Sequence, residues 1–203
     1  MSQRKGLHSI LEIPVFYRLV QWLFYQKKAY DVWYGMVGNF KDKVVLDIGC
    51  GPGTETKYFK GSKKYIGVDI SSIYIDEAKK NYPNAGDFYC CSIEKIAELP
   101  IDNIDIITIK GVFHHLSSDI IQDFLKKIHH KINPEGRIIT LDCAFEKNKL
   151  LSNFVVGLDR GMHVRSIPDY KSLLTDGYTL DNESKVFQIL PPYLRYYMQI
   201  KKV

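Results

Sequence analysis

A glycine-rich stretch with an acidic neighbour is the first candidate for chemistry in this chain. In VVLDIGCGPGTETKYF (Val44–Phe59), Asp47 precedes Gly49, Gly51 and Gly53. Glycine tolerates positive φ and lets a ligand approach backbone amides closely. Where a strand leads into a helix, such a loop is a common ligand site. A tight turn would also use glycines, so other residues must decide between the two.

Two further segments point to the same edge of a sheet. The apolar run KYIGVDI ends in Asp69, where an acidic residue is placed to hydrogen-bond ribose hydroxyls. A later run, IDIITI, is followed by GVFHHLSS, which brings His114 and His115 to that edge. Together with the glycines, these residues favour a ribose-bearing ligand over a merely structural turn.

The elements that must position these residues alternate along the chain. Apolar runs predict strands at 44–48, 64–70, 88–91, 104–109 and 137–141, with NPEG (133–136) as a turn. Helical patterns begin at 55–59, after Ser71 or Ser72, and over about 119–131. SKVFQIL and RYYMQIKKV predict two more strands in a hairpin, where Tyr196 and Tyr197 alternate and one is expected in the core. Strands alternating with helices predict an α/β fold with a mainly parallel sheet covered on both faces.

Composition sets broad limits on what the protein does. A length of 203 residues favours one domain. The net charge is +5, but the lysines are spread along the chain, which argues against a nucleic-acid-binding tail. The four cysteines lack zinc-site spacing, so we expect no metal and buried free thiols in a reducing cytosol.

No signal peptide is evident, and we expect a cytoplasmic protein. The candidate membrane segment Ile10–Tyr25 is interrupted by Glu12, Arg18 and Gln21, and it is short for a span of about 20 apolar residues. A helix packed on its own domain is favoured. The alternative is an amphipathic helix in peripheral contact with a membrane surface.

The spacing of the glycines separates two kinds of nucleotide site. A dinucleotide fingerprint needs G-x-G-x-x-G or A, but counting from Gly49 the last position is Thr54. The pattern D-x-G-x-G-x-G instead resembles the first motif of the class I S-adenosylmethionine-dependent methyltransferases. The resemblance runs from about Lys43 to Asp142 and includes YIGVDIS, FHHL and LKKIHHKINPEGRIITLD in the family's order. It implies a three-layer sandwich with a mostly parallel, Rossmann-like seven-stranded sheet that ends in an antiparallel hairpin.

The resemblance also implies S-adenosyl-L-methionine as cofactor and S-adenosyl-L-homocysteine as product. The three glycines would wall the methionine part, with Asp47 near its ammonium group. Ser92 stands where relatives usually have an acidic residue that meets the adenine amino group. The remaining expected contacts are the ribose (Asp69), the two adenine faces (Ile70 and Ile93) and the backbone beside the cofactor (Lys110 and Gly111).

The implied chemistry is nucleophilic attack on a methyl group held by a sulfonium. Much of the catalysis would come from aligning two reactants. A neutral hydroxyl acceptor would also need a base, for which histidine is best suited near pH 7. His115 is the first candidate and His114 the second; the alternative is that one imidazole only caps or orients the loop. His129 and His130 are expected on the following helix, away from this edge.

The resemblance divides the single domain (1–203) into a helical lid over 1–40, a cofactor-binding core over 41–145 and a substrate-binding and C-terminal part over 146–203. Four residues of that last part are candidates to bind a small-molecule acceptor: Arg160, His163, Arg165 and Tyr193. Arginine holds anionic or polyhydroxylated groups through forked hydrogen bonds. The alternative is that the two arginines pair with Asp159 or Asp169 on a solvated loop.

The resemblance leaves several acceptors open. DRG-x-H-V-R-S and the P-Y tail are similar to bacterial methyltransferases of sugar or cell-surface polysaccharide biosynthesis. A quinone-type C-methyltransferase resembles the core nearly as well, and Ser92 keeps open a catalytically silent relative. Nucleic-acid substrates are disfavoured, because KGVF replaces the N/D-P-P-Y/F/W motif that suits amino groups on bases.

Overall fold

The computed structural model describes residues 27–157, 161–188 and 191–203. Its helices are α3 (Lys27–Val37), α4 (Ser72–Asn81), α5 (Ser118–Ile128), α6 (Leu150–Gly157) and α7 (Ile167–Lys171). Short 3-10 turns are η1 (Thr54–Lys57), η2 (Ile93–Glu98), η3 (Phe113–His115) and η4 (His129–Lys131). The strands are β1 (Val44–Ile48), β2 (Lys64–Asp69), β3 (Asp87–Cys90), β4 (Ile104–Lys110), β5 (Ile132–Phe145), β6 (Arg165–Ser166), β7 (Tyr178–Gln188) and β8 (Tyr193–Lys202).

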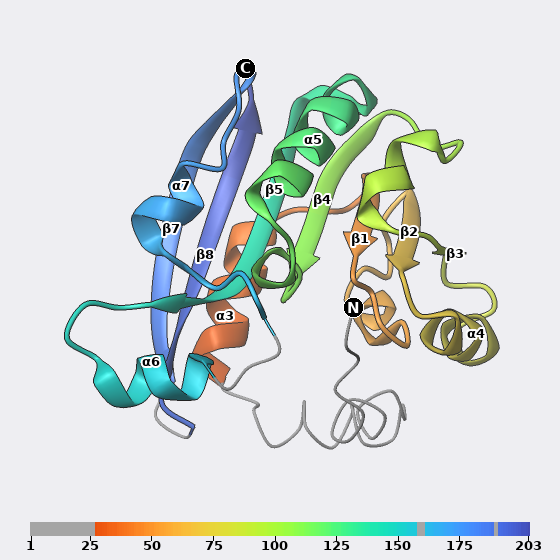
Figure 1. The fold of residues 1–203 in the computed structure, drawn as a ribbon. Coiled ribbons are helices and arrows are strands. Elements are labelled where there is room, and N and C mark those ends of the chain that lie inside the picture. Colours follow the sequence, from red (N-terminus) through yellow and green to blue (C-terminus); the bar gives the residue numbers. More distant parts are fainter. Residues whose placement is uncertain (1–26, 158–160, 189–190) are drawn as a thin grey trace.

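All the strands join one sheet, with the order β3-β2-β1-β4-β5-β8-β7 and with β6 beside β5 (Figure 1). Strands β1 to β6 pair in parallel, whereas β8 runs antiparallel to both β5 and β7. This confirms the predicted α/β fold with a mostly parallel sheet and an antiparallel hairpin. The carboxyl ends of β1, β2 and β4 therefore meet at one edge of the sheet, the lower edge in Figure 1.

Alternation along the strands builds two cores, one on each face of the sheet. In β1, Val45 packs with Trp33 of α3 and Ile75 of α4, while Leu46 packs with Phe124 of α5 on the opposite face. Neighbouring side chains of a strand point to opposite faces, so both sets are buried only because helices cover both. Each fully buried aliphatic side chain of this kind contributes about 1.5–3 kcal/mol. The domain therefore has three layers, with the sheet between two layers of helices.

The C-terminal hairpin extends both cores. Tyr196 and Tyr197 of β8 are 1% and 0% exposed and lie on opposite faces. The Tyr197 hydroxyl donates to the Ala29 carbonyl of α3, and the Tyr196 hydroxyl donates to Glu183. We expected only one of these tyrosines in the core; both belong to it, because the hairpin is also covered on both faces.

Two local predictions were wrong. The segment after the glycines forms only the 3-10 turn η1 and not a helix, since the short connection from Gly53 must return to the amino end of the sheet, where β2 starts. The expected NPEG turn (133–136) lies inside β5 as a bulge, because Ile104 pairs with Ile132 but Ile106 pairs with Arg137. The extra residues are accommodated there without ending the strand.

Candidate active site

The carboxylate of Asp69, at the end of β2, forms a hydrogen bond with the glycine loop (residues 49–53). Asp69 Oδ2 accepts the backbone N–H of Gly51 at 2.9 Å, and its Oδ1 accepts that of Ser71 at 2.9 Å. Each carboxylate oxygen can accept two hydrogen bonds, so each keeps a lone pair for a further donor. Burial raises the pKa of Asp69, and the bonds from Ser71 and Gly51 oppose that rise. Asp69 is thus held at the sheet edge as an acceptor.

Gly49 and Gly53 are required by the protein itself. Their φ values are +77° and +79°, in the left-handed region. A Cβ on Gly49 would lie 2.5 Å from Val112, and one on Gly53 would lie 3.0 Å from Ala78. The tight loop therefore needs glycine at these two positions for conformation and packing, before any ligand is considered.

The residues expected around an adenine lie at the same edge. Ile70 follows Asp69 and is 77% exposed, whereas Ile93, at the start of η2, is only 9% exposed. Ser92 is the N-cap residue of η2, but its side chain makes no capping hydrogen bond. The backbone joins the two segments, since Cys91 N–H donates to the Asp69 carbonyl at 3.0 Å. The exposed Ile70 therefore offers an apolar face next to the Asp69 carboxylate.

Asp47, expected near the cofactor's ammonium group, is buried between neighbouring strands. Its carboxylate is 3% exposed and accepts the Tyr65 hydroxyl at 2.6 Å and the Thr108 hydroxyl at 2.7 Å. Burial and the charge of Glu55 together raise its pKa to about 6, and the hydrogen bonds from Tyr65 and Thr108 oppose this rise. Asp47 therefore joins β1 to β2 and β4 inside the α3 side of the sheet.

A cation surrounded by aromatic rings lies near this network. Lys110 Nζ is 3.0 Å from Glu55 Oε1 and 4.8 Å from the centre of the Trp33 ring. The Tyr34 hydroxyl donates to the other Glu55 oxygen at 3.2 Å. Beside it is a small cavity, lined by Ala29, Tyr30, Trp33, Lys110, Leu141 and Arg195. We expected only the backbone of Lys110 to matter, but its side chain also forms part of this wall.

The two histidines after β4 have different surroundings. His114 is 6% exposed, and its Nδ1 lies 2.7 Å from Oδ1 of Asp142. A carboxylate can only accept, so Nδ1 carries the proton of this hydrogen bond, and the ring could take a further proton only at Nε2. Burial raises the pKa of Asp142, and the hydrogen bonds from His114 oppose this. His115 is exposed, with its ring 4.1 Å from that of His114.

Gly111 and Gly161 border the His114 ring. A Cβ on Gly111 would lie 3.6 Å from Cε1 of His114, and one on Gly161 would lie 2.4 Å from its Cδ2. Nε2 is bonded to both of these ring carbons, so it lies between the two glycines. Gly111, expected beside the cofactor, thus lies next to the imidazole that Asp142 orients.

The residues that we expected to bind the acceptor have different surroundings in the structure. We expected Arg165 to bind the acceptor, but its buried guanidinium donates to the carbonyls of Phe113, His163 and Leu116 and to the Ser118 hydroxyl. The backbone N–H of His163 donates to the His114 carbonyl at 3.0 Å. Tyr193 is the first residue of β8 and lies near the carboxyl end of β5. Its hydroxyl accepts a hydrogen bond from Arg195 at 3.1 Å. Arg160 lies outside the described residues.

Comparisons with known proteins fit this geometry. Residues 46–140, which include the glycine loop, Asp69 and His114, match a family model described as a methyltransferase domain. These residues are therefore similar in sequence to methyltransferase domains. The chain is 34% identical over 112 residues to an uncharacterized protein of Haemophilus influenzae, covering 51% of this chain and 43% of that protein. It is 32% identical over 123 residues to an uncharacterized methyltransferase of Oceanobacillus iheyensis, covering 58% and 54%.

Solved structures of other proteins have the same fold as this chain. A TehB-like SAM-dependent methyltransferase from Corynebacterium glutamicum superposes with a TM-score of 0.67 at 18% identity, covering 98% of this chain and 100% of that one. The chain spans about half the length of the curated relatives it matches.

The residues at this edge of the sheet fit S-adenosylmethionine, the cofactor of such methyltransferases. Asp69 would supply acceptors for ribose hydroxyls, and Ile70 would supply an exposed apolar face for adenine. Asp142 and Glu55 are the site residues that the sequence did not single out. The sequence did contain a signal for Asp142. It ends the apolar run RIITLD, just as Asp47 follows the apolar run VVL.

Within the described residues, no group of three or more His, Cys, Asp or Glu is arranged to hold a metal ion. No helix in the same ranges has the length and apolar character needed to cross a membrane. The segment Ile10–Tyr25 falls outside the described residues.

Proposed function

We propose that the protein is an S-adenosylmethionine-dependent methyltransferase that acts on a small-molecule acceptor, with a sugar or cell-surface polysaccharide intermediate as the first candidate. The observation that carries this proposal is the hydrogen bond from the Gly51 amide to the Asp69 carboxylate, next to the exposed Ile70. It provides a ribose acceptor and an apolar surface at the carboxyl edge of a parallel sheet, where ligands of such folds bind. Residues 41–145 hold the cofactor in this proposal, and 1–40 and 146–203 shape the acceptor site.

His114 is the base of the proposed reaction. When bound, the cofactor would supply a methyl group on a positively charged sulfur; the acceptor atom would form a bond to the methyl carbon, and the sulfur would leave as the neutral thioether of S-adenosylhomocysteine. His114 Nε2 takes the proton of an acceptor hydroxyl, while Asp142 holds the ring through Nδ1 and stabilises the imidazolium that forms. Burial of this pair excludes water from the proton transfer. His114 is buried and oriented by Asp142, whereas His115 is exposed, which favours His114 over our first candidate.

The acceptor lies against the cavity between α3 and the ends of β4, β5 and β8. Tyr30 and Trp33 provide aromatic faces, and Lys110 and Arg195 provide hydrogen-bond donors. A sugar ring has apolar faces that stack on aromatic rings and hydroxyls that accept from cations. Arg165 supports this site indirectly, because it ties His163 to the loop that carries His114.

Calorimetric titration tests the cofactor first. S-adenosylhomocysteine is expected to bind in the micromolar range and NAD to give no heat. Asp69→Asn is expected to weaken the former at least tenfold, because one ribose acceptor is lost, while thermal unfolding checks that the loop remains folded. Asp123→Asn, on the exposed surface of α5, is the matched control and is expected to bind normally. Binding of NAD instead would overturn the proposal.

The acceptor is then sought with the cofactor-loaded protein. Sugars, nucleotide sugars and quinols are screened by thermal shift, because a ligand stabilises the state it binds. Transfer of labelled methyl to a soluble sugar supports the first candidate. Transfer only to a detergent-dispersed quinol supports a C-methyltransferase instead. Cofactor binding without transfer to any of them would favour the catalytically silent relative.

A further inference from the structure

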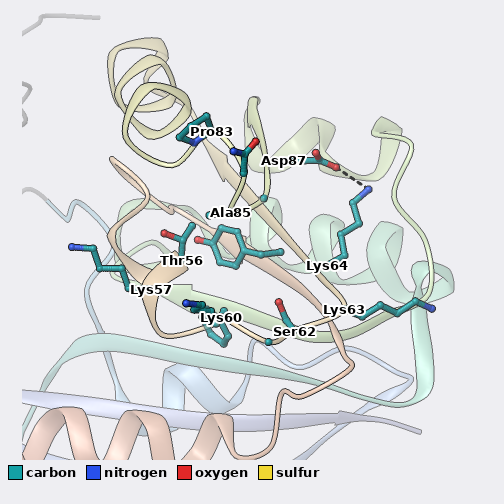
Figure 2. A pocket seen from close by; sticks show the side chains of 14 residues that line it. Thr56, Lys57, Lys60, Ser62, Lys63, Lys64, Pro83, Ala85 and Asp87 are labelled. Carbon is teal, nitrogen blue, oxygen red and sulfur yellow. Dashed lines mark ion pairs between the residues drawn. The ribbon is translucent and has the colours of Figure 1, made fainter.

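A second cleft lies at the opposite edge of the sheet. It has a volume of about 620 Å³ and lies between the 56–65 segment and the 83–87 segment, which face each other across it (Figure 2). Lys64 and Asp87 begin β2 and β3, so the cleft is at the amino ends of these strands. Asp69 lies at the other end of β2, roughly 16 Å away at about 3.3 Å per residue. The cleft is therefore separate from the methyl-transfer site.

The cleft is strongly basic. Four of its lining residues are lysines, Lys57, Lys60, Lys63 and Lys64, and its one acidic lining residue is Asp87. Asp87 is already engaged by Lys64, with 2.8 Å between Oδ2 and Nζ. The other three lysines have no acidic partner within 4.0 Å in the described part of the chain. Like charges gathered at one concavity create a positive potential that attracts anions.

The backbone brings these lysines together. They fall within a single eight-residue stretch, KYFKGSKK, which bends at Gly61 with φ +101°. A Cβ at Gly61 would meet no atom within 4 Å, so this glycine is required for the bend and not for packing. The bend lets Lys57 and Lys60, before Gly61, line the same cleft as Lys63 and Lys64 after it (Figure 2).

Neutral donors accompany the charges. Ser62 and Asn84 also line the cleft, from its two facing segments. A hydroxyl and a side-chain amide each donate to phosphate oxygens, and lysine binds phosphate as a point charge. The volume falls within the range of small-molecule sites, about 300–1,000 Å³. The combination suits a compact anion with several negative charges, and it lacks the extended stripe that a nucleic-acid strand would follow.

We infer that this cleft, which we call the lysine cleft, binds a soluble small molecule that carries a diphosphate or longer phosphate chain. The ligand's phosphates lie among Lys57, Lys60 and Lys63, with Ser62 and Asn84 donating to the remaining oxygens. The three lysines and Asp69 lie at opposite edges of the sheet, so we expect binding in the lysine cleft to be independent of the cofactor.

Calorimetric titration of the full chain with inorganic diphosphate and with tripolyphosphate tests this inference. The expected result is saturable binding of one equivalent that weakens at least tenfold in the double variant Lys60→Gln/Lys63→Gln. The matched control is Lys126→Gln/Lys185→Gln, which removes the same charge from exposed positions on α5 and β7 and is expected to bind within twofold of the original protein. S-adenosylhomocysteine affinity is measured in parallel and is expected to be unchanged in both variants.

Three outcomes would overturn the inference. Absence of heat with either phosphate at millimolar concentration would remove the site. Equal weakening in the two double variants would mean that net charge, and not the cleft, attracts the anion. Binding of a short RNA or of anionic vesicles without binding of the soluble phosphates would assign the lysines to a macromolecular surface. None of these outcomes affects the proposed methyltransferase activity, which depends on the opposite edge.

Discussion

Asp142 Oδ1 accepts both the side-chain Nδ1–H of His114, at 2.7 Å, and the backbone N–H of the same residue, at 3.1 Å. One carboxylate therefore fixes the imidazole and the loop that carries it. The two residues come from the ends of neighbouring strands, since β4 and β5 pair in parallel. Among the described residues, the other carboxylate oxygen is buried and has no hydrogen-bond partner, which costs stability.

Removing either member of this pair is expected to slow methyl transfer. His114→Gln should lower kcat by about 10²- to 10⁴-fold, the usual contribution of a positioned general base. Asp142→Asn should have a comparable effect, because an amide no longer fixes Nδ1 as the protonated nitrogen. Both are measured with labelled cofactor and saturating acceptor, and cofactor affinity is expected to change by less than threefold.

Two other histidines make this prediction specific. His130→Gln, on an exposed position of η4, is expected to leave kcat unchanged. His115→Gln is expected to reduce it by no more than about threefold, since that ring is exposed. A larger loss with His115→Gln than with His114→Gln would return the base role to our first candidate.

Ile70 offers a test of the adenine surface. Its side chain is 77% exposed, so Ile70→Ser should leave the free energy of unfolding within about 0.5 kcal/mol of the original. S-adenosylhomocysteine should nevertheless bind about three- to tenfold more weakly, because an apolar contact with adenine is lost. Leu150→Ser, at an 84% exposed position on α6, is the control for a surface isoleucine-sized side chain and should not change this affinity. Unaltered affinity in Ile70→Ser would place the adenine elsewhere.

The strands and the ligand edge could be predicted from the sequence because they depend on local patterns. β1 begins and ends where its apolar run does, and the glycine loop and Asp69 follow their strands as expected. The contact between Asp142 and His114 could not be predicted in this way. It joins residues 28 positions apart and exists only because β4 and β5 are neighbours in the sheet.

The buried position of Asp47 is a different case, because strand periodicity predicts it. Side chains two apart in a strand share a face, so Asp47 must point the same way as the buried Val45. That face is covered by α3 and α4, which leaves the carboxylate inside the protein with Tyr65 and Thr108 as partners. The motif resemblance drew attention to the loop, whereas strand periodicity already indicated the interior.

Arg165 is expected to support the fold of the site. Arg165→Gln should lower the free energy of unfolding by roughly 2–4 kcal/mol, because buried carbonyls of Phe113 and Leu116 lose their donors. Arg165→Lys should recover only part of this loss, since a single ammonium cannot reproduce the planar fork. Urea unfolding measures both variants, and Lys171→Gln, which breaks an exposed ion pair with Glu183, should cost less than about 1 kcal/mol. Full stability with a raised KM for the acceptor would instead support direct acceptor binding by Arg165.

The buried Asp47 makes a distinct contribution to the pH dependence of stability. Burial raises its pKa from 3.8 to about 6, so between these values the folded state binds the proton more tightly than the unfolded chain does. The contribution of Asp47 to stability therefore falls as the pH rises from about 4 to about 6 and stays low above that. A shift of this size corresponds to roughly 3 kcal/mol. Asp47→Asn does not ionise, so its stability relative to the original protein should rise by about that amount between pH 4 and pH 7.

Urea unfolding at pH 4, 5, 6 and 7 measures this difference directly. Tyr65→Phe serves as a second probe, because the Tyr65 hydrogen bond lowers the pKa of Asp47 and its removal should move the transition to higher pH. A difference between Asp47→Asn and the original protein that is the same at every pH would mean that Asp47 keeps its ordinary pKa. The carboxylate would then have to be hydrated, and its place in the buried network with Tyr65 and Thr108 would be wrong.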